Sequence, residues 1–406
     1  MDLPITGPMT QFVTDITILG GGIAGLWLLN RLRAQGFDVV LLERDELGAG
    51  QTTAAQGILH GGLKYALNGV LSPASSAIAG MPERWRSCLA GQGDVDLRGC
   101  RVLSPSFYMW SSGGYRSRLK TFFGSKALHG RIEAPPPERY PDFFQGRKLA
   151  GALYQLTDFV IDTTSLVEKL AAPHRDRIFR ADAQPIMSDD GEVQALRLGA
   201  EADAPTLRAQ RYILCAGEGN ASLLAAMHRQ QPVMQTRPLH MLALVLPHPH
   251  PVYLHCIGDS FGMTPRLTIT SHPGADGRWV WYVGGELAES GVERSPQEQC
   301  EEGKRMLSAT FPWIDFSSAS WYSFMINRAE PRLPNLQRPD TAYLHASGNL
   351  LVSWPTKLTL SPDLGDSVCE ELLRQGVAPA ANDSLALAAY LQSPAVAAPR
   401  WEGHLS

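Results

Sequence analysis

From Gln11 to Asp45 the chain reads QFVTDITILGGGIAGLWLLNRLRAQGFDVVLLERD, and three structural patterns follow one another in it. Residues 16–19 are mostly apolar, as in a short buried strand. Apolar side chains then recur at the spacing of one helix face, at Ile23, Leu26, Leu29 and Leu32. Gly36 ends this helix, and residues 39–42 form a second buried strand. The stretch therefore predicts a strand–helix–strand unit.

The turn between the first strand and the helix carries the pattern G-x-G-x-x-G at Gly20, Gly22 and Gly25. In a dinucleotide site these glycines permit a tight turn, backbone approach to a pyrophosphate and close helix–strand packing. Glu43 ends the second strand and is suited to bind the adenosine ribose. A glycine triplet alone occurs in many turns, but the complete order favours dinucleotide binding. We assign these residues to the site: Gly20, Gly22, Ile23, Ala24, Gly25, Glu43 and Arg44.

Bulk properties exclude several classes of protein. A chain of 406 residues predicts two lobes, and a net charge of −4 gives no bulk attraction to nucleic acid. The six cysteines include no C-x-x-C pair, so neither a zinc site nor a disulfide framework is expected. No signal peptide and no membrane-spanning run of about 18 apolar residues is recognisable. We expect a cytoplasmic protein, with peripheral membrane contact left open.

Three later segments bear on the choice between FAD and NAD. The first is the glycine-rich loop GAGQTTAAQGILHGGLKY at 48–65. The second is YILCAGEGN at 212–220, a buried strand that runs into a glycine turn. The third is LLVSWPTKLT at 350–359, which an amphipathic segment follows from Asp366 to Arg374.

These segments resemble FAD-dependent oxidoreductases of the D-amino-acid oxidase superfamily, and their motifs are most similar to those of FAD-dependent glycerol-3-phosphate dehydrogenases. The resemblance runs from about Ile16 to Leu373 and implies FAD as the cofactor. In that family the first loop follows the pyrophosphate to the flavin, and the other two segments return to the cofactor. The resemblance adds these cofactor-binding residues: Thr52, Thr53, Gln56, Gly57, His60, Gly61, Gly62, Ala216, Gly217, Lys357, Leu358 and Thr359.

The expected fold is α/β, or α+β overall, with a Rossmann-like FAD-binding domain and a second, mainly antiparallel domain that binds substrate. We assign 12–90, 151–235 and 326–376 to the FAD-binding domain. Ranges 91–150 and 236–325 form the substrate domain, and 377–406 a C-terminal tail. Short apolar runs predict its strands at Met241–Leu246, Leu267–Thr270 and Trp279–Gly284. A helix is predicted at Asp162–Leu170 and short strands at Arg177–Ile186 and Ala195–Leu198.

Four residues match the substrate site of the family. Lys64 and Tyr65 close the His-Gly-Gly loop, Arg328 lies in NRAEP, and Lys357 precedes Leu-Thr. The resemblance implies that they bind a small anionic substrate, and a guanidinium suits a carboxylate through its bidentate geometry. For each cation the alternative is a solvated surface charge, and Arg332 is an alternative to Arg328.

His60 is the candidate general base, because its reference pKa of about 6.5 suits proton transfer near neutral pH. A purely structural role and covalent attachment of the flavin are alternatives. His248, His250 and His255 cluster in the sequence, but no acidic or cysteine ligand has a recognisable spacing, so we expect no metal site.

The leading hypothesis is oxidation of a CH–OH bond by hydride transfer to flavin. Oxidation of a CH–NH bond in an amino acid or amine is the alternative, and a flavin electron-transfer subunit without its own substrate is a third. Lys64 stands where the glycerol-3-phosphate enzymes carry arginine, and Trp354-Pro355-Thr356 replaces their glycines. Quinone, oxygen or a partner flavoprotein remain open as electron acceptor.

Overall fold

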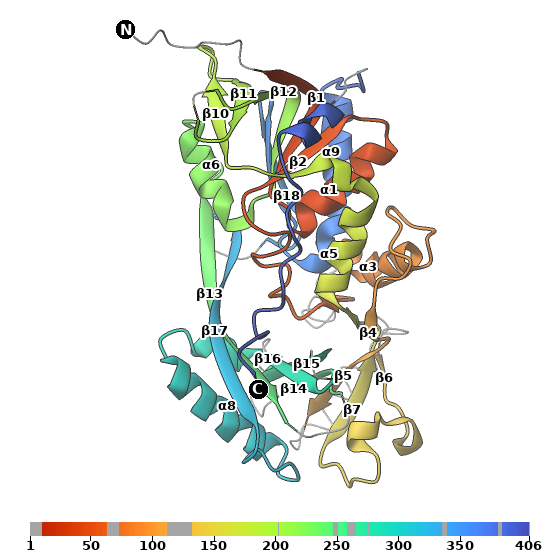
Figure 1. Cartoon of the computed structure of the whole chain (residues 1–406). Helices are drawn as coiled ribbons and strands as arrows, with labels where there is room; N and C mark the ends of the chain where they lie inside the picture. The colour runs from red at the N-terminus through yellow and green to blue at the C-terminus, as the bar shows by residue number, and fades with distance from the viewer. Residues whose placement is uncertain are drawn as a thin grey trace.

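Two large β-sheets, one above the other in Figure 1, organise the chain. The structure is a computed structural model that describes residues 10–62, 73–111, 132–201, 203–246, 251–257, 265–274, 277–334, 339–380 and 384–405. Among the helices of these residues, none is long and apolar enough to cross a lipid bilayer.

The first sheet is built around the parallel strands β1 (Gln11–Leu19) and β2 (Val39–Glu43), which α1 (Ile23–Ala34) connects. Its order is β10-β11-β12-β1-β2-β9, with β19 beside β12 and β18 beside β19. Its other strands are β9 (Ile178–Arg180), β10 (Ala183–Met187), β11 (Val193–Leu198), β12 (Thr206–Leu214), β18 (Tyr343–Ser347) and β19 (Leu350–Trp354). The central strands are parallel, and β10, β11 and β18 extend the sheet in antiparallel fashion.

Helices cover both faces of the first sheet, as expected where parallel strands are buried on both sides. On one face Ile16 and Ile18 pack with apolar residues of four helices, among them Trp27 of α1. These helices are α1, α3 (Pro73–Leu89), α5 (Thr163–Ala171) and α9 (Ser361–Arg374). On the other face Leu19 and Leu42 pack with α6 (Asn220–Ala226).

The second sheet forms the lower lobe in Figure 1 and has the order β17-β13-β16-β15-β14-β5-β7-β6. Its strands are β5 (Phe107–Ser111), β6 (Ile132–Glu133), β7 (Ala152–Leu156), β13 (Met234–Val245), β14 (Leu254–Ile257), β15 (Leu267–Pro273), β16 (Trp279–Gly284) and β17 (Ser320–Pro331). Neighbouring strands are antiparallel except for β14 and β5. One face packs on α8 (Pro296–Thr310), and α7 (Glu286–Ser290) follows β16.

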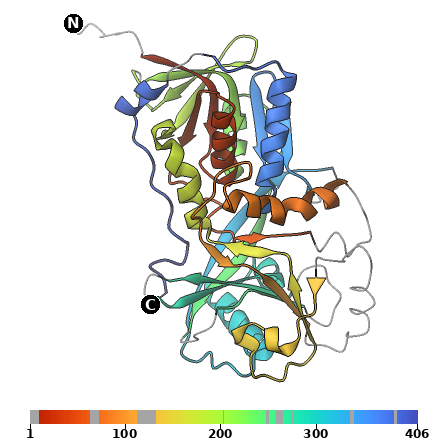
Figure 2. The same cartoon turned by 90° about the vertical axis from the view of Figure 1, so that its right-hand side faces the viewer.

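A small third sheet, β3-β8-β4, lies between the two large ones. It consists of β3 (Ile58–Leu59), β8 (Phe159–Ile161) and β4 (Val102–Ser104). Figure 2 shows these short strands at the junction of the lobes. Because β3 ends the glycine-rich loop, this sheet fixes the position of His60.

The C-terminal tail crosses from one lobe to the other (Figure 2). It begins beside the first sheet, where Ser384 is buried and the 3₁₀ helix Leu385–Ala389 follows. Val396 pairs with Leu47, and Trp401 is buried against Tyr282 of the second sheet. The tail therefore contacts both lobes.

The expected fold class is confirmed, and so are the predicted strand–helix–strand unit and the predicted strands of the second lobe. The structure corrects several boundaries. β1 begins at Gln11 because its first half pairs with Thr206–Leu207, and the run Arg177–Ile186 divides into two strands. The second sheet draws strands from both predicted insertions and also takes β7, which lies within 151–235. The domain boundaries themselves stay a prediction.

Candidate functional site

The glycine turn between β1 and α1 leaves no space for side chains. Gly20 has φ +113°, and a Cβ there would lie 2.6 Å from Cα of Ala216. A Cβ on Gly25 would lie 2.0 Å from the carbonyl oxygen of Gly20. The turn therefore brings β1, α1 and the residue after β12 into backbone contact, as the fingerprint requires.

The N-terminus of α1 is open to an anion. Its first turn carries no acidic residue, and no side chain caps it from Gly22. Thr52 Oγ1 accepts a hydrogen bond of 3.0 Å from the amide of Ile23. Glu43 accepts hydrogen bonds from the amides of Gly21 (2.6 Å) and Asp45 (2.9 Å), which holds its carboxylate beside the same turn. A helix N-terminus without acidic residues favours negative charge, so this site fits a pyrophosphate.

Two further residues assigned to this site from sequence, Ala24 and Arg44, differ in the exposure of their side chains. Ala24 is buried inside α1 and packs in the core. The side chain of Arg44 is exposed, and its Nε lies 3.3 Å from the carboxylate of its neighbour Asp45.

The glycine-rich loop crosses from the first lobe to the second. Thr53 is buried and donates to the carbonyl of Gly48. Gln56 Nε2 donates to the carbonyls of Thr268 (3.0 Å) and Tyr282 (2.9 Å) on the second sheet. Gly57 has φ +71°, and a Cβ there would lie 2.0 Å from the carbonyl of Ile161. These contacts fix the loop between the two sheets.

The returning strands β12 and β19 meet the glycine turn at their carboxyl ends. The amide of Ala216 donates to Asn220 Oδ1 at 2.8 Å, and Asn220 Nδ2 donates to the carbonyl of Ser353. The carbonyl of Gly217, which has φ +57°, accepts from Trp354 Nε1 at 3.1 Å. A ligand crevice at the carboxyl ends of parallel strands is typical of such sheets.

His60 follows β3 and is paired with a buried carboxylate. Its Nδ1 lies 3.0 Å from Asp158 Oδ2, and the other oxygen of Asp158 accepts from the amide of Gly61 at 2.9 Å. The side chain of His60 is 40% exposed, whereas that of Asp158 is 5% exposed. Gly62 follows in a left-handed conformation with φ +75°. The carboxylate thus orients an imidazole whose Nε2 makes no hydrogen bond to the described residues.

The last predicted segment lies against His60. Thr359 is fully buried, and its Oγ1 accepts from the amide of His60 at 2.8 Å. Lys357 lies partly buried at the start of the 3₁₀ helix Leu358–Leu360. Thr356 has φ +60°, so a threonine occupies the conformation that the glycines of similar enzymes adopt readily. This departure from the family pattern therefore places a non-glycine residue in a left-handed conformation.

Arg328 lies on β17 directly opposite Arg237 of β13. Nε of Arg237 donates a hydrogen bond to the buried carboxylate of Glu330. Arg328 Nη2 lies 3.6 Å from Glu289 Oε1, and its Nε is buried without a hydrogen-bond partner in the described part of the chain. Burial lowers the pKa of Arg328, and Glu289 opposes this shift. Arg332, the alternative, is exposed.

Arg328 lies on the face of the second sheet that meets the glycine-rich loop. Side chains alternate along a strand, so Arg328 shares its face with Phe324. Phe324 stacks on Tyr282, whose hydroxyl donates to the carbonyl of Ala54 at 2.8 Å. Arg328 therefore lies on the face of the second sheet that contacts the glycine-rich loop through Tyr282.

Lys64 and Tyr65 lie outside the described residues, as do His248 and His250. Sequence reasoning missed Asp158, because no motif marks an aspartate in the short turn between β7 and β8. It also missed Thr268, which becomes a neighbour of the loop only when the lobes meet.

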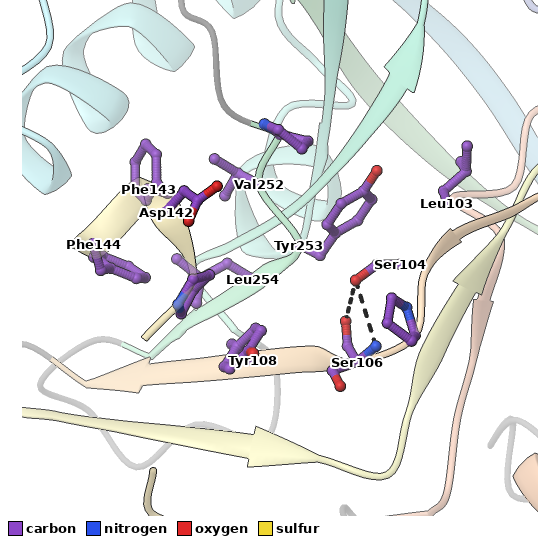
Figure 3. Close-up of a pocket in the computed structure, with 13 residues that line it drawn as sticks. Leu103, Ser104, Ser106, Tyr108, Asp142, Phe143, Phe144, Val252, Tyr253 and Leu254 are labelled. Carbon is purple, nitrogen blue, oxygen red and sulfur yellow. Dashed lines mark hydrogen bonds between the residues drawn. The ribbon is translucent and has the colours of Figure 1, made fainter. Parts of the chain in front are cut away.

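A cavity of about 330 Å³ lies apart from these residues, at the edge formed by β5 and β14 (Figure 3). Figure 3 shows Tyr108, Phe143 and Phe144 among its mainly apolar lining, with Ser104 bonded to Ser106. It contains none of the residues that the motifs indicated.

Comparison with known proteins decides the family. Residues 15–353 match the sequence profile of the FAD dependent oxidoreductase (DAO) family. The chain belongs to this family. It is 45% identical over 390 residues to the probable FAD-dependent oxidoreductase PA4991 from Pseudomonas aeruginosa, covering 96% of this chain and 97% of that one.

Solved structures agree with this assignment. The crystal structure of PA4991 aligns with a TM-score of 0.83 at 40% identity, over 97% of this chain and 99% of that one. Glycine oxidase from Geobacillus kaustophilus aligns with a TM-score of 0.64 at 15% identity, over 95% of this chain and 100% of that one. Dithionite-reduced L-alpha-glycerophosphate oxidase from Mycoplasma pneumoniae, with FAD bound, aligns with a TM-score of 0.63 at 13% identity, over 91% of this chain and 97% of that one. The two remote structures show the shared fold alone.

This flavoenzyme therefore uses FAD, and its residues fit that cofactor. The open α1 N-terminus suits the pyrophosphate, and the carboxylate of Glu43 lies beside it. Because Gly20 and Gly25 have no side chains, a ligand can approach the backbone of this turn closely. The loop from Thr52 to His60 then leads from the glycine turn to the space between the lobes.

Proposed function

We propose that this FAD-dependent enzyme oxidises a CH–OH bond of a small anionic substrate. The observation that carries the proposal is the pairing of His60 with the buried carboxylate of Asp158 at 3.0 Å. An alcohol holds its hydroxyl proton far too tightly to lose it to water near neutral pH. A base that accepts this proton during oxidation is therefore needed, and an aspartate-oriented imidazole is suited to that task.

The proton would follow a short path. FAD, when bound, accepts the hydrogen that leaves the substrate carbon with its electron pair. The proton of the substrate hydroxyl is transferred to Nε2 of His60, since Nδ1 is held by Asp158. The negative charge of Asp158 stabilises the imidazolium that results, and its low exposure strengthens that interaction. The oxidised product is a carbonyl compound.

Arg328 would bind the anionic group of the substrate. Its guanidinium is partly buried, and the ion pair that it makes with Glu289 is long at 3.6 Å. A buried guanidinium that lacks full hydrogen bonding gains from a carboxylate or phosphate, which can accept two parallel hydrogen bonds. Lys357 and Lys64 would add positive charge near the same substrate, as the resemblance implies.

An anaerobic flavin-bleaching experiment tests the proposal. The purified, FAD-loaded enzyme is mixed with glycolate, lactate, glycerol 3-phosphate and a set of amino acids one at a time, and absorbance near the flavin maximum is followed. We expect bleaching by a hydroxy acid or phosphorylated alcohol, and a loss of about 100-fold in its rate in His60→Asn. Bleaching by amino acids alone would refute CH–OH oxidation. Acid precipitation separates free from covalent flavin.

Oxidation of a CH–NH bond is the second candidate, and Arg328 is the observation that favours it. A single guanidinium on the sheet face can bind the carboxylate of an amino acid as well as that of a hydroxy acid. A protonated amine loses its proton to water far more readily than an alcohol does and is then a neutral amine ready for oxidation, so this chemistry depends less on His60. A bleaching rate with amino acids that survives His60→Asn would support this second candidate. If every small compound leaves the flavin oxidised, a partner protein must supply the electrons.

A further inference from the structure

His255 of β14 faces His60 across the junction of the lobes. The two imidazoles are nearly parallel, with 10° between their planes and 6.1 Å between their centres. His60 comes from the loop of the flavin lobe, and His255 comes from the second sheet. The ring of Phe107 packs against His255 at 4.5 Å. The juxtaposition exists only because the two lobes meet here.

In each ring Nδ1 has a hydrogen-bond partner, but the two partners differ in kind. Nδ1 of His60 lies 3.0 Å from the carboxylate of Asp158, and Nδ1 of His255 lies 2.9 Å from the hydroxyl of Thr268. Within the described residues, Nε2 of neither ring makes a hydrogen bond. Thr268 is itself positioned, because its carbonyl accepts from Gln56 of the flavin loop.

The partner and the burial of His255 favour a neutral ring. A carboxylate stabilises a protonated ring, whereas a hydroxyl pairs with a neutral one. Burial lowers the pKa of His255 to about 3, and the neighbouring His60 adds to this shift while Asp158 opposes it. His255 therefore remains neutral at physiological pH.

We propose that His255 is a substrate-positioning residue that donates a hydrogen bond from Nε2 to the reacting oxygen. Thr268 donates its hydroxyl proton to Nδ1, so that Nε2 of His255 carries the ring hydrogen. His60 Nε2 accepts the proton of the same substrate hydroxyl. One imidazole thus orients the oxygen while the other takes its proton. This inference rests on the proposed CH–OH oxidation.

The tautomer can be measured without a substrate. Long-range ¹H–¹⁵N spectra of the FAD-loaded protein, labelled with ¹⁵N-histidine, are recorded from pH 5 to 9, and the His255 signals are assigned by their loss in His255→Phe. We expect a neutral ring with its hydrogen on Nε2 over this whole range. In Thr268→Val the hydrogen should move partly to Nδ1. A ring that titrates in this range, or that carries its hydrogen on Nδ1 in the wild type, would overturn the inference.

Kinetics then test the positioning role. His255→Phe keeps an aromatic ring beside Phe107 but removes the donor, and His255→Gln keeps an N–H near the position of Nε2. With whichever of glycolate, lactate or glycerol 3-phosphate bleaches the wild-type flavin, we expect kcat/KM to fall about tenfold in His255→Phe and to recover largely in His255→Gln. The pH at which the rate falls should stay unchanged, because His60 remains.

The outcomes separate the two proposals. If no alcohol bleaches the wild-type flavin, the proposed function fails, while the tautomer measurement still decides the state of His255. If an alcohol bleaches the flavin and His255→Phe is as fast as the wild type, the positioning role fails alone. If His255→Phe does not fold, His255→Gln and Thr268→Val still provide the comparison.

Discussion

At the scale of single residues, the partner of each titratable group decides its role. Asp158 presents a carboxylate to the half-exposed His60, and Thr268 presents a hydroxyl to the more deeply buried His255. Arg237 and Arg328 lie opposite each other on neighbouring strands, but only Arg237 is neutralised by the buried Glu330. One contact each thus distinguishes residues of the same type.

Asp158→Asn should abolish the basic function of His60 while preserving the loop. The side-chain oxygen of asparagine can still accept the hydrogen bond from the amide of Gly61. Its NH₂ group then donates to Nδ1 of His60, which forces the ring hydrogen onto Nε2. A ring in that tautomer cannot accept a proton at Nε2. We expect the rate of flavin reduction to fall about 100-fold at unchanged flavin content. A rate within twofold of wild type, measured by anaerobic stopped flow, would argue against the base.

Arg328→Met should weaken substrate binding rather than flavin binding. Removing one partner of a buried ion pair costs about 2–5 kcal/mol, so the substrate concentration for half-maximal flavin reduction should rise about 100-fold. The matched control is Arg332→Met, because Arg332 is exposed on the same segment. Equal effects of the two substitutions would show that Arg328 has no special role.

At the scale of elements, close backbone contacts and buried side chains fix how each element packs. α1 can approach β1 because Gly25 has no side chain, and β15 carries the buried His272 against Tyr282 and Trp401. Both features predict how a single substitution in an element changes flavin binding or stability.

Gly25→Ala should displace α1 and reduce FAD affinity. Its Cβ would lie 2.0 Å from the carbonyl oxygen of Gly20, which belongs to the backbone and cannot rotate away. We expect a purified protein with less than half of the wild-type flavin content. Gly50→Ala is the control, since nothing lies within 4 Å of its Cβ and the residue is exposed. Equal flavin content in the two variants, by absorbance of the purified proteins, would contradict the role of Gly25.

His272 should make folding stability depend on pH. Burial lowers its pKa to about 4, from an unfolded value of about 6.5. Between these pH values the unfolded chain binds a proton that the folded chain does not, so stability falls as the pH falls through this window. His272→Gln should reduce this slope by up to about 1.4 kcal/mol per pH unit. The free energy of unfolding, measured by urea unfolding at several pH values from 7 to 4, gives this slope.

Thr270→Val is the control for this slope. The hydroxyl of Thr270 contacts Nε2 of His272 at 2.9 Å, so its loss lowers stability but keeps the imidazole. The variant should unfold at lower urea concentration at every pH, with the wild-type slope. A wild-type slope in His272→Gln would mean that other groups account for the acid sensitivity.

At the scale of the whole molecule, the tail and the glycine-rich loop hold the lobes together. Arg400 donates to the carbonyl of Ala49 at 2.7 Å, and Trp401 packs on Tyr282 with 4.8 Å between ring centres. The ring of His404 stacks on Tyr322 at 4.1 Å. The match to the DAO family profile ends at residue 353, so these contacts come from beyond the matched range.

Trp401→Ala should destabilise the enzyme by about 3 kcal/mol, as expected for truncation of a buried tryptophan. Because the side chain joins the tail to the second lobe, we also expect faster release of FAD on dilution. The midpoint of urea unfolding and flavin fluorescence measure the two effects. Glu402→Ala is the control, since Glu402 is exposed and its loss should change stability by less than about 0.5 kcal/mol.

The local sequence was sufficient for the strand–helix–strand unit, the cofactor and the fold class. The unit depends on patterns within about 35 residues, where apolar spacing and the glycine triplet act through local geometry. The cofactor and the fold class depend in addition on the segments 48–65, 212–220 and 350–359 and on the family that they resemble. The predicted positions of β1, α1, β2 and the strands of the second lobe follow from the same patterns. Their boundaries shifted where a distant strand lengthened the pairing, as Thr206 does for β1.

Only the tertiary structure decided which side chains meet. Asp158 and His60 are 98 positions apart, and Thr268 lies on the other lobe. No periodicity or spacing predicts such contacts, because they depend on how β3 pairs with β8 and how the two sheets face each other. The sequence by itself determined a flavin-binding fold, since that chemistry is local. The environment of the candidate base arises from packing between segments that are distant in the chain.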